Sequence, residues 1–214
     1  MSKANLYLSL VGRYPIITDQ MTAKRLLVIL REMERVIVDR DIEGEIVEFG
    51  CYSGTTSLFM ERLLQAHNSN NKLLYVYDSF EGLPDKSIKD ASVAGTAFKA
   101  GELKATKRQL IKNFKQAGLR LPVIHKGWFS DLKESDMPST IAFGLLDGDF
   151  YDSIMDSLKL VWPRLAPNGS IVVDDYDKSN LPGVTRALND FFKNQNVRIR
   201  HEHDLAIIRN NLRW

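Results

Sequence analysis

The hydrophobic pattern is clearest between residues 141 and 177. Residues 141–146 (IAFGLL) form a short apolar run, which is typical of a strand covered on both faces, and a second such run ends at Val173. Two parallel strands joined by a crossover helix place their carboxyl ends at one edge of the sheet. Between the two strands, apolar side chains at three- and four-residue spacing predict a helix: Ile154, Leu158, Val161 and Leu165. Pro167-Asn168-Gly169 ends it.

The rest of the chain continues this alternation of strands and helices. An apolar stripe predicts a helix that is capped at Thr18-Asp19 or Thr22 and runs to about Asp39. A basic helix is predicted over 102–117, with Gly118 as its stop. Short apolar runs predict further strands at 45–50, 73–77, 122–126, 197–200 and 205–208.

This order of elements predicts an α/β fold with a doubly wound sheet in a single domain over residues 1–214. We expect residues 1–40 to form an N-terminal helical segment that either packs on the sheet or closes over the site as a lid. The segment 85–101 shows no period, and a loop of that length in a compact domain is usually functional.

Composition excludes several classes of protein. The 214 residues are 44% hydrophobic and 26% charged, as in an ordinary globular domain, and no apolar run approaches a membrane span. The formal net charge of +2 gives no reason to expect a nucleic acid partner. The only cysteine, Cys51, cannot form an intramolecular disulfide, which favours a reducing cytoplasm.

Positive charge is concentrated in residues 85–134, which hold eleven Lys or Arg and five Asp or Glu, a balance of +6. Either this is a solvated basic helix face, or it is a positive rim that attracts an anionic acceptor.

Acidic residues follow both strands of the 141–177 stretch. Asp147 and Asp149 come after the first strand, and Asp174 and Asp175 come after the second. Each can be explained as a cap of the next helix or turn. Four carboxylates at one edge repel one another unless a positive charge lies between them, and Mg²⁺ binds such oxygen ligands. The matching positions favour a metal or substrate site.

A glycine turn follows the first predicted strand. Gly50 and Gly54 permit close backbone approach to a ligand, and the helix after them offers free N–H groups. The spacing is G-x-x-x-G, not the G-x-G-x-x-G of a dinucleotide site, so it suits a smaller anion. Asp78 ends the next strand, where nucleoside-binding sheets bind ribose hydroxyls.

Taken together and in order, these motifs resemble the macrocin O-methyltransferase family, from about Thr18 to Phe192. The motifs that carry the resemblance are VEFGCYSG, VYDSFEGLP, GWF, LLDGDFYDS and GSIVVDDY. The resemblance implies a class I, Rossmann-like fold: a seven-stranded, mostly parallel sheet with a final antiparallel pair and helices on both faces. It also implies a Mg²⁺-dependent transfer of a methyl group from S-adenosylmethionine to a hydroxyl of a sugar or another vicinal diol.

The resemblance also assigns roles to single residues. It places the methionine end of the cofactor at the glycine turn, the ribose at Asp78 and the adenine near Trp128, and it makes Asp149 the general base. The implied Mg²⁺ ligands are Asp147, Asp174 and Asp175, of which Asp147 also faces the cofactor. The other implied cofactor contacts are Glu48, Gly50, Tyr52, Ser53, Gly54, Ser79 and Phe80. Ser53 departs from the family, whose members usually carry Arg at this position.

The chemistry of an alcohol agrees with these roles. A hydroxyl is a poor nucleophile at neutral pH, and Mg²⁺ bound to two vicinal oxygens lowers its pKa and orients it. A neighbouring carboxylate then removes the proton. The acceptor is a small molecule, with an anionic sugar as one candidate, and a homo-oligomer is one possible assembly.

Two other functions use the same sheet. A nucleotide-binding oxidoreductase would require a third glycine, and a non-catalytic S-adenosylmethionine-binding protein would not need the complete acidic set. Cys51 lacks an activating base, and His125 lies within a strand pattern. His201 and His203 could bind a metal, although two ligands alone make a weak site.

Overall fold

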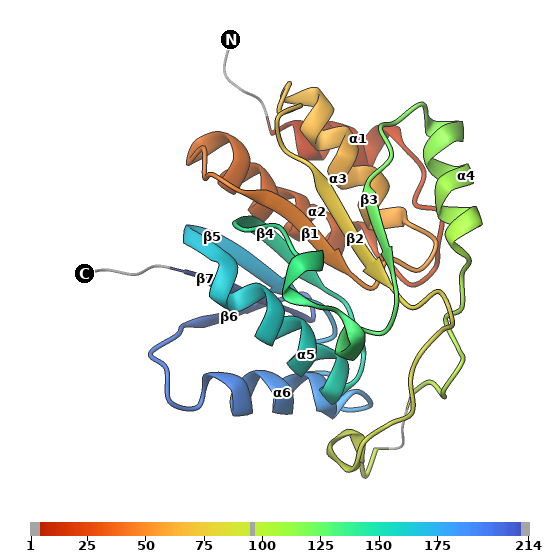
Figure 1. Ribbon diagram of the computed structural model, residues 1–214, viewed down its shortest axis with the longest axis vertical. Coiled ribbons are helices and arrows are strands. Elements are labelled where there is room, and N and C mark those ends of the chain that lie inside the picture. The colour runs from red at the N-terminus through yellow and green to blue at the C-terminus, as the bar shows by residue number, and fades with distance from the viewer. Residues whose placement is uncertain (1–4, 95–96, 211–214) are drawn as a thin grey trace.

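The computed structural model describes residues 5–94 and 97–210, so the predicted domain limits at residues 1 and 214 lie outside the described residues. The sheet has seven strands in the order β3-β2-β1-β4-β5-β7-β6 (Figure 1). β7 runs antiparallel to both β5 and β6, and the other pairs are parallel. The strands are β1 (Glu45–Phe49), β2 (Leu74–Asp78), β3 (Val123–Lys126), β4 (Ile141–Leu146), β5 (Leu165–Val173), β6 (Ile199–Glu202) and β7 (Leu205–Arg209). The predicted sheet is confirmed.

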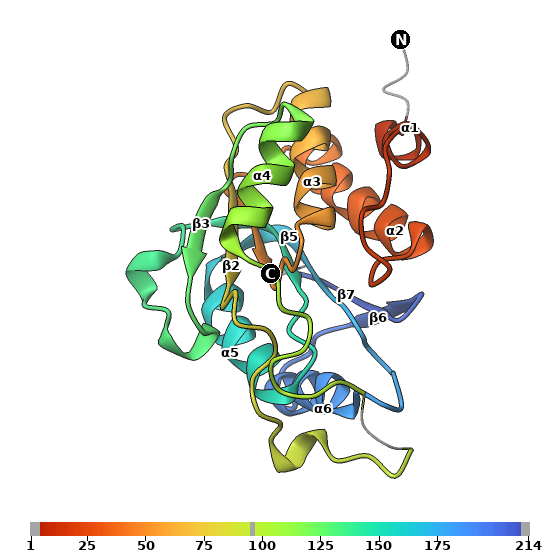
Figure 2. The ribbon, with the colours of Figure 1, turned by 90° about the vertical axis from the view of Figure 1, so that its right-hand side faces the viewer.

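Helices cover both faces of this sheet (Figure 2). The apolar sides of α2, α3 and α4 pack on one face, with α1 outside α2 and α3, and α5 and α6 pack on the other. The helices are α1 (Leu6–Arg13), α2 (Ala23–Glu34), α3 (Thr55–Ala66), α4 (Lys107–Ala117), α5 (Tyr151–Val161) and α6 (Pro182–Phe192).

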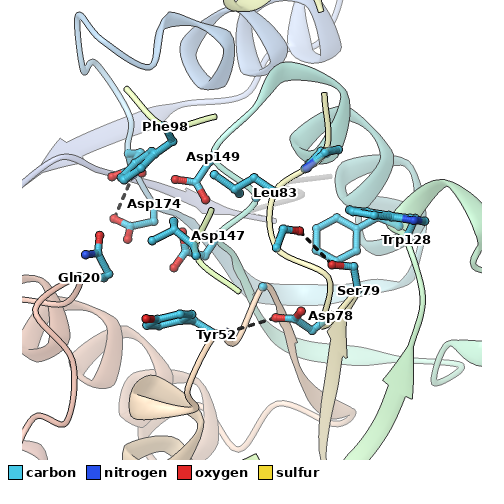
Figure 3. A pocket seen from close by; sticks show the side chains of 18 of the residues that line it. Gln20, Tyr52, Asp78, Ser79, Leu83, Phe98, Trp128, Asp147, Asp149 and Asp174 are labelled. Carbon is cyan, nitrogen blue, oxygen red and sulfur yellow. Dashed lines mark hydrogen bonds between the residues drawn. The ribbon is translucent and has the colours of Figure 1, made fainter. Parts of the chain in front are cut away.

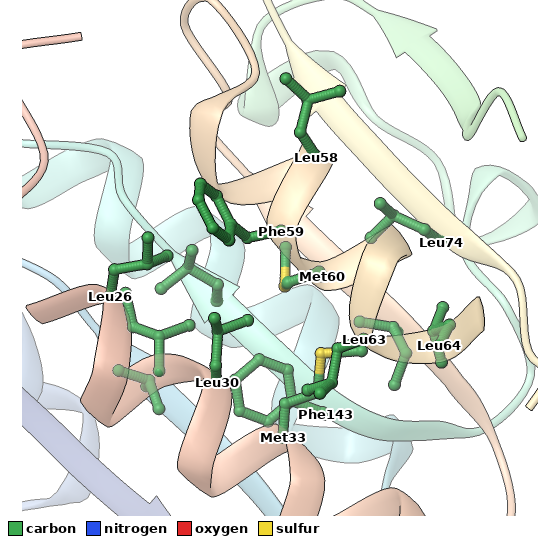
Figure 4. Close-up of a cluster of buried hydrophobic side chains, with 14 of the residues drawn as sticks. Leu26, Leu30, Met33, Leu58, Phe59, Met60, Leu63, Leu64, Leu74 and Phe143 are labelled. Carbon is green, nitrogen blue, oxygen red and sulfur yellow. The ribbon is translucent and has the colours of Figure 1, made fainter. Parts of the chain in front are cut away.

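Helix α2 forms where its apolar stripe predicts. The Thr22 side chain caps it by accepting a hydrogen bond from the backbone N–H of Arg25, and a π-helical turn over Arg35–Asp39 continues it. Leu26, Leu30 and Met33 are fully buried against α3 and β4 (Figure 4). This packing fixes the start of α2, which lies beside the carboxyl ends of the central strands.

The order of the strands reverses at β1, which pairs with β2 on one side and β4 on the other. At such a switch point, the crossover helices leave the sheet on opposite faces, and a crevice opens at the carboxyl ends of the two strands. Backbone hydrogen bonds align the strand ends, since Asp147 N–H donates to Phe49 and Asp174 N–H donates to Leu146. The predicted acidic positions are therefore neighbours in space.

Several predicted boundaries are wrong. Helix α4 begins at Lys107, not at 102, because the Thr106 side chain caps it. The helix after β4 ends at Val161, and Leu165 instead begins β5 by pairing with Ile141. Helix α1 lies within the predicted N-terminal helical segment 1–40, whereas the sequence pattern does not predict α6. The segment between β2 and α4, part of which lies outside the described residues, extends beyond the strand ends toward α6 (Figure 1).

Candidate active site

A cavity of about 310 Å³ opens at the carboxyl ends of the central strands (Figure 3). It brings together most of the residues predicted from the sequence: Gly50, Tyr52, Asp78, Ser79, Trp128, Asp147, Asp149, Asp174 and Asp175. Figure 3 shows Asp147, Asp149 and Asp174 gathered in one part of it, with Ser79 and Trp128 in another. The predicted residues outside its lining are Glu48, Ser53, Gly54 and Phe80.

The glycine turn after β1 packs tightly on its neighbours. Gly50 has a φ of +83°, and a Cβ there would lie 1.9 Å from the carbonyl oxygen of Asp147. Gly54, with a φ of +87°, precedes α3, and a Cβ there would lie 2.3 Å from Leu110 Cδ1. Both positions therefore require glycine for conformation and for space.

The Asp78 carboxylate binds the glycine turn. Its Oδ2 accepts hydrogen bonds from the backbone N–H groups of Cys51 (2.9 Å) and Tyr52 (3.1 Å), and its Oδ1 accepts one from Phe80 N–H (2.7 Å). Asp78 therefore fixes the turn in addition to lining the cavity. Phe80 itself packs in the hydrophobic core on the α2 and α3 face.

Glu48 lies beneath the turn. It is 1% exposed and accepts a hydrogen bond from the hydroxyl of Ser57 in α3. Burial raises the pKa of its carboxyl to about 8, against the opposing effect of the Ser57 bond. Glu48 thus supports α3 from below and does not line the cavity.

Two hydroxyls at the turn are buried without a hydrogen-bond partner in the described part of the chain, those of Ser53 and Thr55. They flank Gly54 at the N-terminal end of α3. A buried polar atom without a partner is costly, so these two hydroxyls favour a hydrogen-bonding ligand at the N-terminal end of α3, although neither residue lines the cavity.

The four acidic residues meet in the crevice. Asp149, Asp174 and Asp175 are each at most 8% exposed. Burial, reinforced by the neighbouring carboxylates, raises the pKa of Asp147 and Asp149 well above the ordinary range and raises that of Asp174 to about 6. Asp149 and Asp175 both have a φ of +58°, a strained conformation that is common at functional sites.

Two cations that sequence reasoning missed accompany these carboxylates. Nη1 of Arg25 lies 2.8 Å from both carboxylate oxygens of Asp174 and 3.3 Å from Oδ1 of Asp175. Nζ of Lys178 donates to Oδ1 of Asp175. Burial lowers the pKa of Arg25, but Asp174 and Asp175 outweigh burial and raise it. No pattern in the sequence connects Arg25 to residues 149 positions away.

The remaining wall is largely apolar and comes from the segment after β2. Leu83, Pro84, Phe98 and Leu103 line the cavity. Two backbone hydrogen bonds of 2.9 Å, from Leu83 N–H to Glu102 and from Gly101 N–H to Leu83, close the ends of this segment. The cavity therefore combines an acidic end with an apolar wall.

The basic residues of 85–134 do not contribute to this lining, whose cations are Arg25 and Lys178. The predicted positive rim is therefore no part of the cavity wall. Two of those basic residues, Lys104 and Lys126, instead pair with Glu81 at the surface.

The other candidate residues take structural positions. Cys51 is buried, and burial raises the pKa of its thiol, which disfavours a nucleophile. His125 stacks on Tyr77 with ring centroids 5.0 Å apart. His201, on β6, makes a T-shaped ring contact with Tyr176.

Across residues 5–94 and 97–210, no group of three acidic, histidine or cysteine side chains is arranged to hold a metal ion. None of the helices in these ranges has the length and apolar character needed to cross a membrane.

Comparison with known proteins relates this geometry to a family. The family model for macrocin O-methyltransferase (TylF) matches residues 10–206. Among curated proteins, the 8-demethyl-8-(2,3-dimethoxy-alpha-L-rhamnosyl)-tetracenomycin-C 4'-O-methyltransferase of Streptomyces olivaceus is 31% identical over 174 residues, 78% of this chain and 66% of that protein. The demethyldecarbamoylnovobiocin O-methyltransferase of Streptomyces niveus is 28% identical over 154 residues, 69% of this chain and 58% of that protein.

The chain therefore spans 58% and 66% of the lengths of these two curated relatives. Among solved structures, the O-methyltransferase NovP has the same fold. Its TM-score is 0.77 at 24% identity, over 88% of this chain and 80% of that one.

Proposed function

The chain belongs to the macrocin O-methyltransferase family, and on that premise we propose that it transfers a methyl group from S-adenosylmethionine to a hydroxyl of a sugar or another vicinal diol. The observation that carries this proposal is the single cavity that joins the glycine turn and Asp78 to the four buried carboxylates. A methyl donor and a polyhydroxyl acceptor can meet only where both ends open into one space.

The glycine turn and Asp78 would hold the cofactor. The buried hydroxyls of Ser53 and Thr55 lie where the methionine carboxylate would meet the N-terminus of α3. Asp78 would accept hydrogen bonds from the ribose hydroxyls, and Trp128, whose side chain is partly exposed in the cavity, would pack on the adenine.

The acidic residues would hold Mg²⁺, and their donor chemistry fits that ion. All the candidate donors are carboxylate oxygens, which Mg²⁺ prefers, and the four acidic residues share the cavity lining with two cationic side chains, Arg25 and Lys178. We assign the ion to Asp147, Asp174 and Asp175. When bound there, Mg²⁺ would polarise the acceptor hydroxyls and lower their pKa.

The proton of the acceptor hydroxyl would pass to Asp149. Asp149 lies in the same cavity as the proposed ligands, where its carboxylate can accept the proton of a hydroxyl bound beside it. As the hydroxyl oxygen bonds to the methyl carbon, the carbon–sulfur bond breaks and its electron pair neutralises the sulfonium. The leaving thioether needs no acid.

Other properties of the proposed enzyme follow from the same residues. The apolar wall of Leu83, Pro84, Phe98 and Leu103 would contact the less polar part of the acceptor. A free, buried Cys51 suits the reducing cytoplasm. We retain a single catalytic domain and a homo-oligomer as proposals. The family match gives no support to an oxidoreductase.

Calorimetric titration of S-adenosylmethionine, and separately of NADPH, into the protein tests the cofactor. S-adenosylmethionine should bind to the parent protein and much more weakly to Asp78→Asn. The matched control Glu81→Gln, which changes an exposed carboxylate of the same segment, should bind it normally. Binding of NADPH without S-adenosylmethionine would reject the proposal in favour of an oxidoreductase. Cofactor binding without transfer to any diol would favour a non-catalytic binding protein.

A further inference from the structure

Arg25 forms ion pairs with Asp174 and Asp175, two of the three carboxylates to which we assign the metal. Its Nη1 donates to both oxygens of Asp174, at 2.8 Å each, and lies 3.3 Å from Oδ1 of Asp175. The Arg25 side chain is only 10% exposed, and that of Asp174 only 3%. A buried guanidinium with this geometry is a strong counter-ion, not a surface contact.

The same guanidinium reaches back to the segment that precedes α2. Nη2 of Arg25 donates to the backbone carbonyl of Gln20, and the Arg25 backbone N–H donates to the side chain of Thr22. Asp19 and Gln20 line the cavity beside the carboxylates, and Figure 3 shows Gln20 on the same side as Asp174. Arg25 therefore ties this segment to the carboxyl ends of the strands.

Nη1 of Arg25 lies between the two oxygens of Asp174, so a divalent cation that binds both of them must displace it. Mg²⁺ requires carboxylate oxygens at about 2.0–2.1 Å in octahedral geometry. Both oxygens of Asp174 already accept from Nη1, and Asp174 Oδ1 also accepts from the backbone N–H of Asp175. The guanidinium of Arg25 and a divalent cation bound to the same carboxylate would also repel each other strongly in a buried cavity.

We propose that Arg25 is a resident counter-ion that Asp174 and Asp175 exchange for a divalent cation, so that metal binding releases the segment around Gln20 from the cavity. This inference rests on the metal ligands named in the proposed function. Helix α2 itself stays in place, because Leu26, Leu30 and Met33 are fully buried in the core. The movement is confined to the Arg25 side chain and residues 18–22, which control access to the acidic end of the cavity.

The exchange predicts that Arg25 stabilises the metal-free protein and not the metal-bound one. The test compares the parent protein with Arg25→Gln and with Lys24→Gln, which removes the same charge from the neighbouring exposed position. Calorimetry measures Mn²⁺ affinity, and melting is recorded in EDTA and in saturating MnCl₂. Arg25→Gln should bind Mn²⁺ about tenfold or more tightly than the parent, because no side chain competes. It should melt lower than the parent in EDTA and at the same temperature in MnCl₂.

Lys24→Gln should match the parent in every measurement. If Arg25→Gln does not fold, Arg25→Lys retains the charge without the planar guanidinium, and its Mn²⁺ affinity should also exceed that of the parent. Unchanged Mn²⁺ affinity, or a melting difference that persists in MnCl₂, would overturn the exchange and leave the proposed function standing. Absence of Mn²⁺ binding by the parent and both variants would reject the exchange and the metal ligands together, whereas cofactor binding would still stand.

Discussion

The carbonyl oxygen of Asp147 lies 1.9 Å from the position that a Cβ on Gly50 would occupy. The ends of β1 and β4 are therefore as close as a glycine backbone allows, and this contact holds the glycine turn against the acidic end of the cavity. The φ of +83° at Gly50 adds a conformational reason for glycine.

Gly50→Ala should destabilise the protein by roughly 1–3 kcal/mol or more and weaken S-adenosylmethionine binding, because the β1 and β4 ends must move apart. Chemical denaturation and calorimetry would measure both effects. Gly12→Ala is the matched control. Gly12 lies in α1 with no atom within 4 Å of an added Cβ, so the change should be neutral or slightly stabilising. Equal effects of the two substitutions would contradict the close contact.

The protein without metal or cofactor should lose stability as pH rises between the unfolded and the folded pKa of Glu48. Its pKa is about 8 in the folded protein and near 4.5 when unfolded, so between these values the folded state binds the extra proton. The Glu48 contribution is therefore fully present below pH 4.5 and is lost as pH rises toward 8. Its slope is at most about 1.4 kcal/mol per pH unit.

Melting temperatures at pH 5.5 and pH 8 in EDTA would measure this loss. Glu48→Gln should lose less stability across the range than the parent, whereas Glu43→Gln, at an exposed position, should follow the parent. The pKa values of Asp147 and Asp149 are also raised, so these groups likewise make the protein less stable as pH rises. Glu48→Gln should therefore still lose some stability between pH 5.5 and pH 8. Parallel curves for the parent and Glu48→Gln would contradict the raised pKa of Glu48.

Asp149→Asn should lower kcat by about 10²- to 10⁴-fold with little change in S-adenosylmethionine affinity, because the amide cannot accept the hydroxyl proton. Steady-state kinetics with a saturating acceptor would show this. Asp152→Asn, at an exposed position of the first turn of α5, is the matched control and should retain turnover. Full activity of Asp149→Asn would remove Asp149 as the base.

Phe98→Ala should raise the acceptor KM about tenfold and leave cofactor affinity unchanged, since Phe98 belongs to the apolar wall. Ile88→Ala, at a residue of the same segment that is 89% exposed, should change neither the acceptor KM nor the cofactor affinity. The comparison requires only initial rates over a range of acceptor concentrations. If both substitutions raised the KM alike, the effect would come from loop conformation and not from the wall.

The sheet and the edge at which its cavity opens could be predicted because their signals are local. The run at 141–146 is buried on both faces, so nearly every residue is apolar, and the strand ends where Asp147 begins. The acidic positions then follow from parallel topology alone. Leu165 was assigned to the wrong element because its spacing from Val161 suits a helix, whereas pairing with Ile141 makes it part of β5.

The two cations of the site could not be predicted in this way. Arg25 reaches Asp174 only because core packing fixes α2 beside the strand ends, and nothing in the helical stripe indicates that contact. Glu48 is the opposite case, a residue that the sequence assigns to the site and that lies outside the cavity lining. It has the position of a cofactor ligand in the sequence, but its side chain bonds to Ser57 in α3, outside the cavity lining.

The most direct test of the account is transfer of a labelled methyl group from S-adenosylmethionine to sugars with vicinal hydroxyls, in Mg²⁺ and in EDTA. Each sugar is paired with its deoxy analogue, which lacks one of the two hydroxyls. The account predicts a labelled O-methyl product from at least one vicinal diol in Mg²⁺, with little product from its deoxy analogue or in EDTA. Equal transfer in Mg²⁺ and EDTA would contradict the role assigned to Asp147, Asp174 and Asp175, and no transfer to any diol by protein that binds the cofactor would contradict the proposed reaction.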